Sequence, residues 1–378
     1  MNYKQIRHIM NPTISNISEE GDIYKFTLSG LNVSLANGLR RIILSEIPCV
    51  AIKTETYKDN QCSISVNTGR LHNEILKQRL SCIPIHVKME DINMLPGKYA
   101  LEVDVSNDTD NTTFVTTEHF KIKNKENGNY LTREETMKIF PPNAKTNSYI
   151  DFARLRPKIS DSIPGESLKL SSEFSISSAR DNSSFNVVSK CSYGNTPDLV
   201  KVSKLWDERE SQLRSQEATM ADIAFQKKNF YILDSQRSFV PDSFDFIIRT
   251  IGFYENRDIV KFAAEILTKK FDEMITQIDS GTVNINLSET TVENCYDIIL
   301  ENEDYTIGKI IEFILYDRYY MGDKTLTFCG FKKFHPHDAH GTVRIAFAQA
   351  ADLNMVKQHL KIACSEAKAF YKTVNRLF

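Results

Sequence analysis

The N-terminal part of the chain first alternates apolar and polar residues and then changes to a helical period. Residues 23–31 alternate, which predicts a β-strand. Asn32 and Ser34 are favourable N-terminal caps for a helix, and Pro48 ends the helical stretch. The apolar residues between them recur every three or four positions, at Leu35, Leu39, Ile42, Ile43 and Ile47. Residues 49–56 then predict a second strand.

The C-terminal part repeats this design with longer helices. Residues 244–251 predict a strand, and residues 258–278 predict an amphipathic helix. The apolar face of that helix carries Val260, Ala263, Leu267, Phe271, Met274 and Ile278. Four further strands are predicted at residues 282–287, 295–300, 325–331 and 342–347. A helix is predicted at residues 306–317.

The last helix carries an apolar stripe along its whole length. The stripe consists of Leu353, Val356, Leu360, Ala363, Ala367, Phe370, Val374 and Leu377. This spacing of three and four predicts packing along another helix, although such a stripe is also typical of an ordinary core. Two long and two short helices, each set with its own strands, predict two similar half-domains that bury their apolar faces on each other.

The predicted fold class is therefore α+β, with two half-domains paired pseudo-symmetrically within one chain and an inserted domain. Residues 1–56 and 241–280 form one half-domain, residues 281–378 form the other, and residues 57–240 form the insertion. The insertion is predicted to be β-rich, with strands at 83–87, 99–105, 113–122, 168–176 and 186–191 and a helix at 70–80.

Two segments of the insertion are predicted to lie outside its folded core. Residues 124–148 are rich in Asn, Lys, Thr and Pro, which predicts a mobile surface loop. Residues 198–228 are highly charged and have few apolar anchors, which predicts a solvated helix or a linker.

The charge balance favours protein partners over direct binding of nucleic acid. Among 378 residues, 47 are Lys or Arg and 49 are Asp or Glu, which gives a formal net charge of −2. A protein that binds nucleic acid by itself usually carries a basic excess. No stretch reaches the roughly 20 apolar residues that a membrane helix needs. Residues 1–5 lack the apolar core of a signal peptide, so we expect a reducing, intracellular location.

The cysteines agree with that expectation. They are scattered along the chain and odd in number, at Cys49, Cys62, Cys82, Cys191, Cys295, Cys329 and Cys364. Such a distribution predicts buried small hydrophobic residues rather than a disulfide framework. Because no two cysteines are separated by only two to four residues, we expect no cysteine-bound metal cluster.

No catalytic motif is found in the sequence. A Gly-rich phosphate loop, Gly-x-Ser-x-Gly, His-Glu-x-x-His and a dense Asp motif for magnesium are all missing. We therefore predict no catalytic residue and no cofactor in this chain. One cluster leaves two interpretations open, because His335, His337 and His340 with Asp338 could hold a metal ion or could form a polar turn between two strands.

Six segments resemble the alpha-like subunits of multisubunit RNA polymerases, and one of them is a turn at residues 155–157 (LRP). Residues 30–48 (GLNVSLANGLRRIILSEIP) resemble the signature helix of the D-type subunit, and residues 72–74 and 79–85 resemble its next motif. Residues 303–308 (EDYTIG) and 330–336 (GFKKFHP) resemble the smaller L-type subunit. The resemblance implies that both halves of the heterodimer are joined in one polypeptide, as in large DNA viruses.

The resemblance also implies roles for individual residues. Polar residues are expected to bind the largest polymerase subunits, namely Asn37, Arg40, Arg41, Glu46 and Arg79. A solvated polar face is the other interpretation of these side chains. The expected intramolecular dimer interface consists of Leu39, Ile43, Leu267, Phe271, Ile310, Ile314, Leu360, Ala367 and Phe370. Thr306 is predicted to be the N-cap of its helix, with Asp304 as a favourable charge beside it.

The function implied by the resemblance is that of a non-catalytic platform. The two largest subunits of a DNA-directed RNA polymerase would assemble on it, together with small subunits of the same complex. DNA would be contacted only through the complex, and neither a membrane nor a homodimer is expected. If the protein is viral, it would work in the host cytoplasm, in a virion or in the nucleus. The alternatives are a homodimeric subunit like bacterial alpha and a metal-dependent enzyme that uses His335, His337 and His340.

Overall fold

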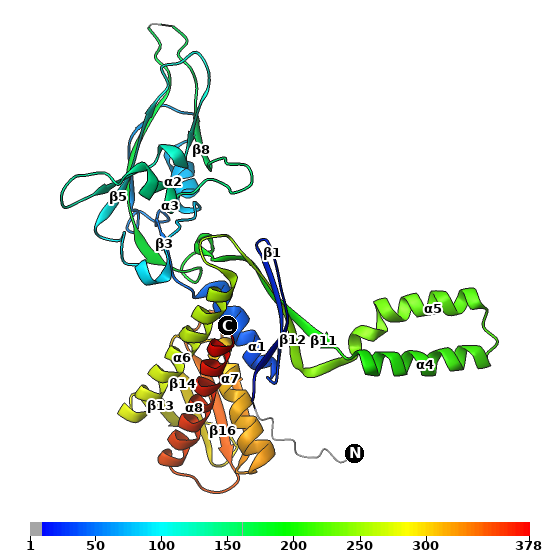
Figure 1. Ribbon diagram of the computed structural model, residues 1–378. Coiled ribbons are helices and arrows are strands. Elements are labelled where there is room, and N and C mark those ends of the chain that lie inside the picture. The colour runs from blue at the N-terminus through cyan, green and yellow to red at the C-terminus, as the bar shows by residue number, and fades with distance from the viewer. Residues whose placement is uncertain (1–9, 161) are drawn as a thin grey trace. The chain divides into compact units, whose positions relative to one another are not determined.

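The computed structural model describes residues 10–160 and 162–378 and divides the chain into two compact units (Figure 1). The first unit comprises Met1–Ile42, Lys190–Arg249 and Val260–Phe378, and the second comprises Ile43–Ser189 and Thr250–Ile259. The segment on which the signal peptide was judged, residues 1–5, lies outside the described residues. Within the described ranges, none of the helices combines the length and apolar character that a membrane-spanning segment requires.

The first unit contains an antiparallel sheet that begins with the predicted N-terminal strand. Its strands follow the order β1–β2–β12–β11, with β1 at Thr13–Glu20, β2 at Ile23–Ser29, β12 at Phe239–Thr250 and β11 at Val188–Pro197. Phe26 of β2 lies opposite Phe246 of β12, and the two rings stack with centroids 5.1 Å apart. Alternate residues of both strands are buried, as the alternation in the sequence requires.

Helix α1 (Val33–Ser45) follows β2 directly. The backbone N–H of Ser34 donates to Oδ1 of Asn32 at 2.8 Å, so Asn32 caps the helix as predicted. Its apolar stripe is buried at Leu35, Leu39, Ile42, Ile43 and Ile47. After Pro48, the chain enters a strand that is shorter than predicted, β3 (Cys49–Ala51).

A second antiparallel sheet in the same unit is formed by the C-terminal strands. Their order is β13–β14–β16–β15, with β13 at Asn284–Leu287, β14 at Cys295–Leu300, β16 at Gly341–Phe347 and β15 at Leu326–Lys332. The helices of this region are α6 (Asn256–Ser280), α7 (Tyr305–Leu315) and α8 (Leu353–Leu377), with a π-helical turn at Tyr316–Gly322. Figure 1 shows α6, α7 and α8 beside one another, together with α1.

The second unit is built around a four-stranded antiparallel sheet of order β4–β9–β5–β7. These strands are Cys62–Asn67, Ser167–Glu173, Tyr99–Ser106 and Lys121–Asn124. Two smaller pairs join β6 (Thr113–Thr116) to β8 (Asp151–Leu155) and β10 (Ser175–Ser177) to β3. Helix α2 (Asn73–Ser81) contributes Leu76 and Leu80 to the core of this unit, where Phe152 and Leu101 are also fully buried.

Four predictions about this part of the chain were wrong. The strand predicted at 113–122 is interrupted by a 3₁₀ turn at Thr117–His119, which separates β6 from β7. Residues 124–148 are not only a loop, because they contain α3 (Arg133–Ile139), whose capping box joins Thr132 and Glu135. Residues 83–87 form no strand. The strand predicted at 168–176 is divided at Phe174, which is buried in the core between β9 and β10.

The charged segment from 198 to 228 forms a hairpin of two helices, which agrees with the helical one of the two predicted alternatives. Its helices are α4 (Leu199–Ser215) and α5 (Met220–Ile232), and it lies between β11 and β12 in the chain. The hairpin has a small core of its own at Val202, Trp206, Ile223 and Phe230. Residues 190–249 belong to the first compact unit, whereas the sequence placed residues up to 240 in the insertion.

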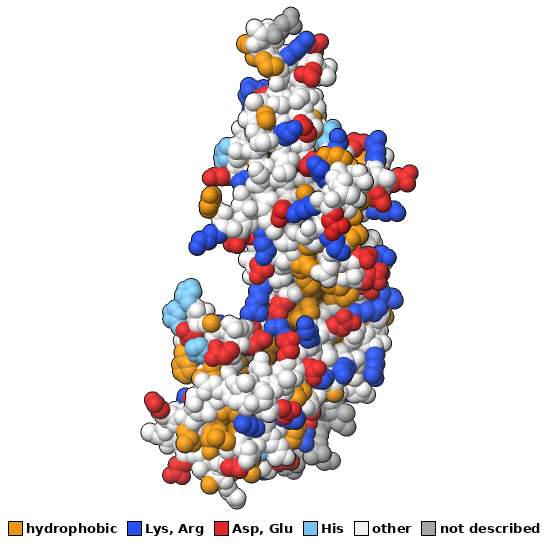
Figure 2. All heavy atoms as spheres, turned by 90° about the vertical axis from the view of Figure 1, so that its left-hand side faces the viewer, with side chains coloured by type: hydrophobic (Ala, Val, Ile, Leu, Met, Phe, Trp, Pro, Cys, Tyr) orange, Lys and Arg blue, Asp and Glu red, His pale blue; other side chains and the backbone are white. Residues whose placement is uncertain are grey.

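One face of the molecule carries interspersed charges of both signs. On the face shown in Figure 2, basic and acidic side chains alternate over short distances and no large patch of either sign is visible. This agrees with the net charge of −2. A surface that binds nucleic acid by itself would gather its basic groups on one face.

Candidate functional site

Arg41 connects α1 to the start of α7. Its Nε donates a hydrogen bond to Oγ1 of Thr306 at 2.7 Å, and its Nη2 lies 2.5 Å from Oδ2 of Asp304. These partners are separated from Arg41 by more than 260 positions in sequence. Arg41 lies in the segment that resembles the D-type subunit and Asp304 in one that resembles the L-type subunit, so the contact joins these two segments.

Asp304 is the N-cap of α7, which corrects the prediction that Thr306 has this role. The backbone N–H of Thr306 donates to Oδ1 of Asp304 at 2.7 Å, and α7 begins at Tyr305. Thr306 is already inside the helix and is 5% exposed. Burial alone raises the pKa of Asp304, but the hydrogen bonds from Thr306 and the charge of Arg41 outweigh burial and lower it.

The low pKa of Asp304 predicts a pH-dependent contribution to stability. Because its pKa is lower in the folded than in the unfolded chain, ionised Asp304 stabilises the fold above the unfolded value of about 4, and this contribution is lost as pH falls further. Asp304→Asn keeps a capping side chain but removes the charge. We expect it to cost about 1 kcal/mol in urea unfolding at pH 7, since the side chain is partly exposed. This cost should shrink below about pH 4, and an equal cost at both pH values would contradict the assignment.

Gly38 allows α1 to approach α7 and α8 closely. A Cβ atom at Gly38 would lie 2.7 Å from Cδ1 of Ile310 and 2.9 Å from the hydroxyl of Tyr371. The Tyr371 hydroxyl donates to the backbone carbonyl of Leu35 at 3.0 Å, and its complete burial raises its pKa. The three helices therefore meet at a position where any side chain would force Ile310 and Tyr371 to shift.

Helices α6 and α8 make a run of polar contacts beside their apolar faces. The three contacts join Asp279 to Lys361 with Oδ1 and Nζ 2.6 Å apart, Asp272 to Lys368, and Glu265 to Asn375 with Oε1 and Nδ2 3.2 Å apart. We call this run the α6–α8 ladder. As the residue number rises by seven on α6, it falls by seven on α8, so the two helices are antiparallel.

Aromatic and ionic contacts reinforce the same contact region. The rings of Phe271 and Tyr371 are stacked with centroids 6.2 Å apart. Nζ of Lys270 lies 2.9 Å from Oε1 of Glu303, and both side chains are less than 20% exposed. Through Lys270, α6 therefore contacts the segment that carries the cap of α7.

A comparison with protein families matches residues 25–271 to the RNA polymerase Rpb3/Rpb11 dimerisation domain. The chain belongs to this family. The match extends from β2 through α1 and the second unit into α6. The Arg41 contact thus joins the matched region to Asp304 and Thr306, which lie beyond it.

Individual relatives of the Rpb3/Rpb11 family share shorter segments with the chain. Subunit 3B of DNA-directed RNA polymerases IV and V from Arabidopsis thaliana is 39% identical over 74 residues, which is 20% of this chain and 21% of the relative. Subunit RPB3 of RNA polymerase II from Schizosaccharomyces pombe is 40% identical over 73 residues, 19% of this chain and 22% of the relative. DNA-directed RNA polymerase subunit Rpo3 from Pyrococcus furiosus is 33% identical over 88 residues, which is 23% of this chain and 30% of the relative. The chain therefore spans less than a third of each relative's length.

All nine residues predicted for the dimer interface are buried, as residues of an ordinary core also are, so the interface itself stays a prediction. Each is at most 3% exposed, namely Leu39, Ile43, Leu267, Phe271, Ile310, Ile314, Leu360, Ala367 and Phe370. The sequence analysis did not identify Gly38 and Tyr371 as residues at the contact of α1 with α7 and α8. A glycine in the interior of a helix costs about 1 kcal/mol relative to alanine, so Gly38 could have been recognised as a position of close approach.

The residues predicted to bind large subunits are distributed over both units. In the first unit, Nε of Arg40 donates to Oδ1 of Asn37 at 2.9 Å, and Arg41 makes the contacts described above. In the second unit, Oε1 of Glu46 lies 3.1 Å from Nη1 of Arg180. Arg79 donates to the backbone carbonyls of Asp151 and Phe152. Binding of a partner by these residues stays a prediction.

The histidine cluster has the geometry of a polar turn. The backbone N–H of His337 donates to Nδ1 of His335 at 3.2 Å, and the backbone N–H of His335 donates to Oδ2 of Asp338 at 2.8 Å. Nδ1 of His335 and Oδ2 of Asp338, which could each bind a metal ion, thus accept hydrogen bonds from backbone N–H groups instead. Among the described residues, no group of three or more His, Cys, Asp or Glu side chains is arranged to hold a metal ion.

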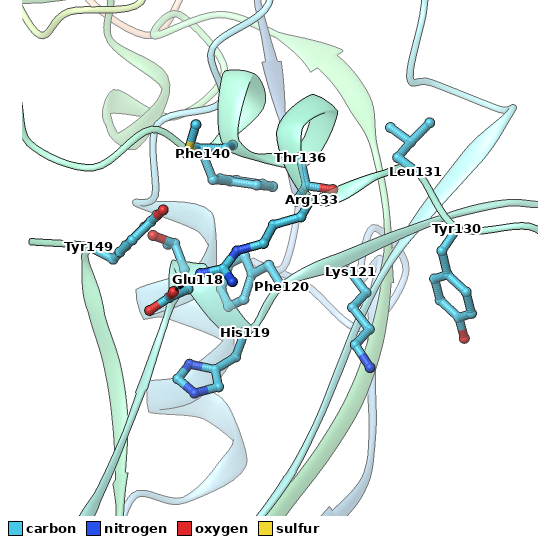
Figure 3. Close-up of a pocket in the computed structure, with 12 residues that line it drawn as sticks. Glu118, His119, Phe120, Lys121, Tyr130, Leu131, Arg133, Thr136, Phe140 and Tyr149 are labelled. Carbon is cyan, nitrogen blue, oxygen red and sulfur yellow. Dashed lines mark hydrogen bonds and ion pairs between the residues drawn. The ribbon is translucent and has the colours of Figure 1, made fainter.

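A cavity of about 640 Å³ lies in the second unit beside α3. In Figure 3, Phe120 and Phe140 lie within it, and Arg133 reaches toward Glu118, with which it forms an ion pair. The Phe120 and Phe140 rings are 5.2 Å apart and packed edge to face. Since Arg133 is neutralised by Glu118, the cavity presents no strong anion-binding group from this pair.

Proposed function

We propose that this chain is a non-catalytic assembly subunit of a DNA-directed RNA polymerase in which an Rpb3-like half and an Rpb11-like half are joined. Membership of the Rpb3/Rpb11 family supports the first part of the proposal. The observation that carries the second part is the bond of Arg41 to Asp304 and Thr306. In this proposal, α7 and α8 supply within one chain the partner surface that a separate small subunit supplies elsewhere.

The proposed halves pair pseudo-symmetrically through their helices. The half with β2 and α1 ends in the long helix α6, and the half with β14 and α7 ends in the long helix α8. Joining them in one polypeptide makes their pairing intramolecular, so that it does not depend on subunit concentration. This arrangement resembles the fused subunits of large DNA viruses, and we propose an intracellular, reducing site of action such as a viral factory, a virion or the nucleus.

The paired halves are proposed to present a surface on which the two largest polymerase subunits assemble. On the first unit, this surface would carry Asn37 and Arg40, which are polar and only partly buried. Glu46, which is partly buried, and Arg79, which is exposed, belong to the second unit. Arginine forms planar, multidentate hydrogen bonds and often anchors protein interfaces. No catalytic or cofactor role is proposed for this chain, and DNA would be contacted through the assembled enzyme.

Arg40→Glu tests this surface without disturbing the Arg41 contact. We expect the tagged variant to lose most of the two large chains when it is purified from cells that make the polymerase, because truncating or reversing an interface anchor costs at least about 2 kcal/mol. Recovery of partners, quantified by mass spectrometry, is the measurement. Lys228→Glu on the exposed side of α5 is the matched charge reversal and should keep both partners. Full recovery of both large chains with Arg40→Glu would show that Arg40 is not part of the binding surface.

A further inference from the structure

The buried apolar residues of α6 and α8 repeat with the same spacing. On α6 one row consists of Val260, Ala264, Leu267, Phe271, Met274 and Ile278, beside which Ile259 and Ala263 are also buried. On α8 one row consists of Val356, Leu360, Ala363, Ala367, Phe370 and Val374, beside which Cys364 and Tyr371 are also buried. The intervals are four, three, four, three and four residues in both rows. Because the two stripes match, burial of apolar surface by itself also permits either helix to pair with its own copy from a second chain.

The polar residues beside the stripes differ between the two helices. The α6–α8 ladder places only acidic residues on α6, at Glu265, Asp272 and Asp279, and only basic or neutral residues on α8, at Lys361, Lys368 and Asn375. The hydrogen bond from Lys368 and the nearby charge of Lys372 lower the pKa of Asp272, so α8 presents a basic strip to α6. Over its length, α8 carries five Lys or Arg residues and one Glu.

Self-pairing would bring like charges together. In an antiparallel pair of two α6 helices with the same register, Asp272 would face its own copy and Glu265 would face Asp279 of the other chain. In a pair of two α8 helices, Lys368 would face its own copy. Like charges at such flanking positions are the means by which paired helices reject wrong partners.

We propose that the α6–α8 ladder selects the pairing of α6 with α8 and disfavours the pairing of either helix with a second copy of the chain. Exposed ion pairs contribute little to stability individually. Selectivity, however, depends on the difference between attractive contacts in one pair and repulsive contacts in the other. The proposal concerns how the chain recognises itself and does not require that it assembles a polymerase.

The test uses a variant in which the ladder charges are exchanged between the helices. This variant carries Asp272→Lys, Asp279→Lys, Lys361→Asp and Lys368→Asp, so its own halves still match. A protease site is inserted after Gly281 in both the parent and an isotope-labelled exchanged protein. Each protein is folded as the whole chain and cut, and the two are mixed, unfolded in urea and refolded together. Native mass spectrometry then counts the four pairs of an N-terminal with a C-terminal half, together with any pairs of two N-terminal or two C-terminal halves.

Matched pairs should exceed mismatched pairs at least about fivefold at low salt. The ratio should fall toward one in 1 M salt, because screening acts on exposed charges. Equal amounts of the four pairs at low salt would overturn the proposal. A control exchanges the same number of charges away from the ladder, through Asp108→Lys, Asp110→Lys, Lys324→Asp and Lys333→Asp, and should give the four pairs equally at every salt concentration.

A second measurement needs no refolding of cut protein. In the intact chain, exchanging charges on α6 alone or on α8 alone should lower the melting temperature by roughly 2–6 °C. Combining both exchanges should return it to within about 2 °C of the parent. If the two decreases in melting temperature simply add, the ladder residues of α6 and α8 do not interact and the proposal fails. That result would leave the proposed polymerase role untouched, because the role is tested by co-purification.

Discussion

Phe271→Ala should lower the free energy of unfolding by about 3–5 kcal/mol, the loss expected when a fully buried phenylalanine is truncated. Phe271 is 0% exposed, and its ring stacks with that of Tyr371. The substitution removes this contact and leaves a cavity between α6 and α8. Urea unfolding of the purified chain measures the loss.

Phe328→Ala is the matched control for this prediction, since the Phe328 side chain is 47% exposed on β15. It should cost less than about 1 kcal/mol, as surface substitutions usually do. Equal losses for the two variants would mean that Phe271 is not packed between the helices as described.

Gly38→Leu should be destabilising by about 2–3 kcal/mol, although leucine is the better helix former. A side chain at this position would overlap Cδ1 of Ile310 and the Tyr371 hydroxyl. It would therefore push α1 away from α7 and α8 and strain the hydrogen bond from Tyr371 to Leu35. The midpoint of urea unfolding and the near-ultraviolet circular dichroism of the tyrosines report both effects.

Two further variants separate overlap from other effects at Gly38. In Gly38→Ala, the new methyl group meets Cδ1 of Ile310, so adding Ile310→Val should recover part of the loss. Gly194→Leu lies on β11 where a Cβ atom would meet no other atom within 4 Å, and it should cost little. A Gly38→Leu protein as stable as the parent would contradict the close approach of the three helices.

The elements with a clear apolar period were predictable because their burial follows from local spacing. The stripe from Leu35 to Ile47 gave α1, and the stripes on α6 and α8 gave two long helices within a few residues of their ends. Asn32 was recognised as a cap because its side chain bonds a neighbouring backbone N–H. These features depend on residues within one or two turns of each other.

The features that the sequence did not predict depend on contacts between residues distant in sequence, or on short helical patterns within polar segments. Arg41 was predicted to bind a large subunit, which stays a prediction, but local spacing could not locate its partners within the chain, Asp304 and Thr306 at the start of α7. The box formed by Thr132 and Glu135 was visible in the sequence, yet the polar composition around it suggested a loop. The hairpin of α4 and α5 buries only a few residues, so its stripe is weak.

The choice between Asp304 and Thr306 as the cap shows a similar limit. Both side chains are suitable caps, and only two positions separate them. The backbone geometry decides, because α7 begins at Tyr305 and Thr306 turns its hydroxyl toward Arg41. The local sequence therefore specified the helix start to within two residues but left its cap ambiguous.

The most direct test of the proposed role is a mild purification of the tagged chain from cells that naturally make it, with every partner weighed and counted. We predict one copy of this chain with two very large chains, no separate Rpb11-like small subunit, and RNA synthesis by the eluate on a nonspecific DNA template. Recovery of the chain alone, as a homodimer, or with a separate Rpb11-like subunit would contradict a fused assembly subunit of RNA polymerase.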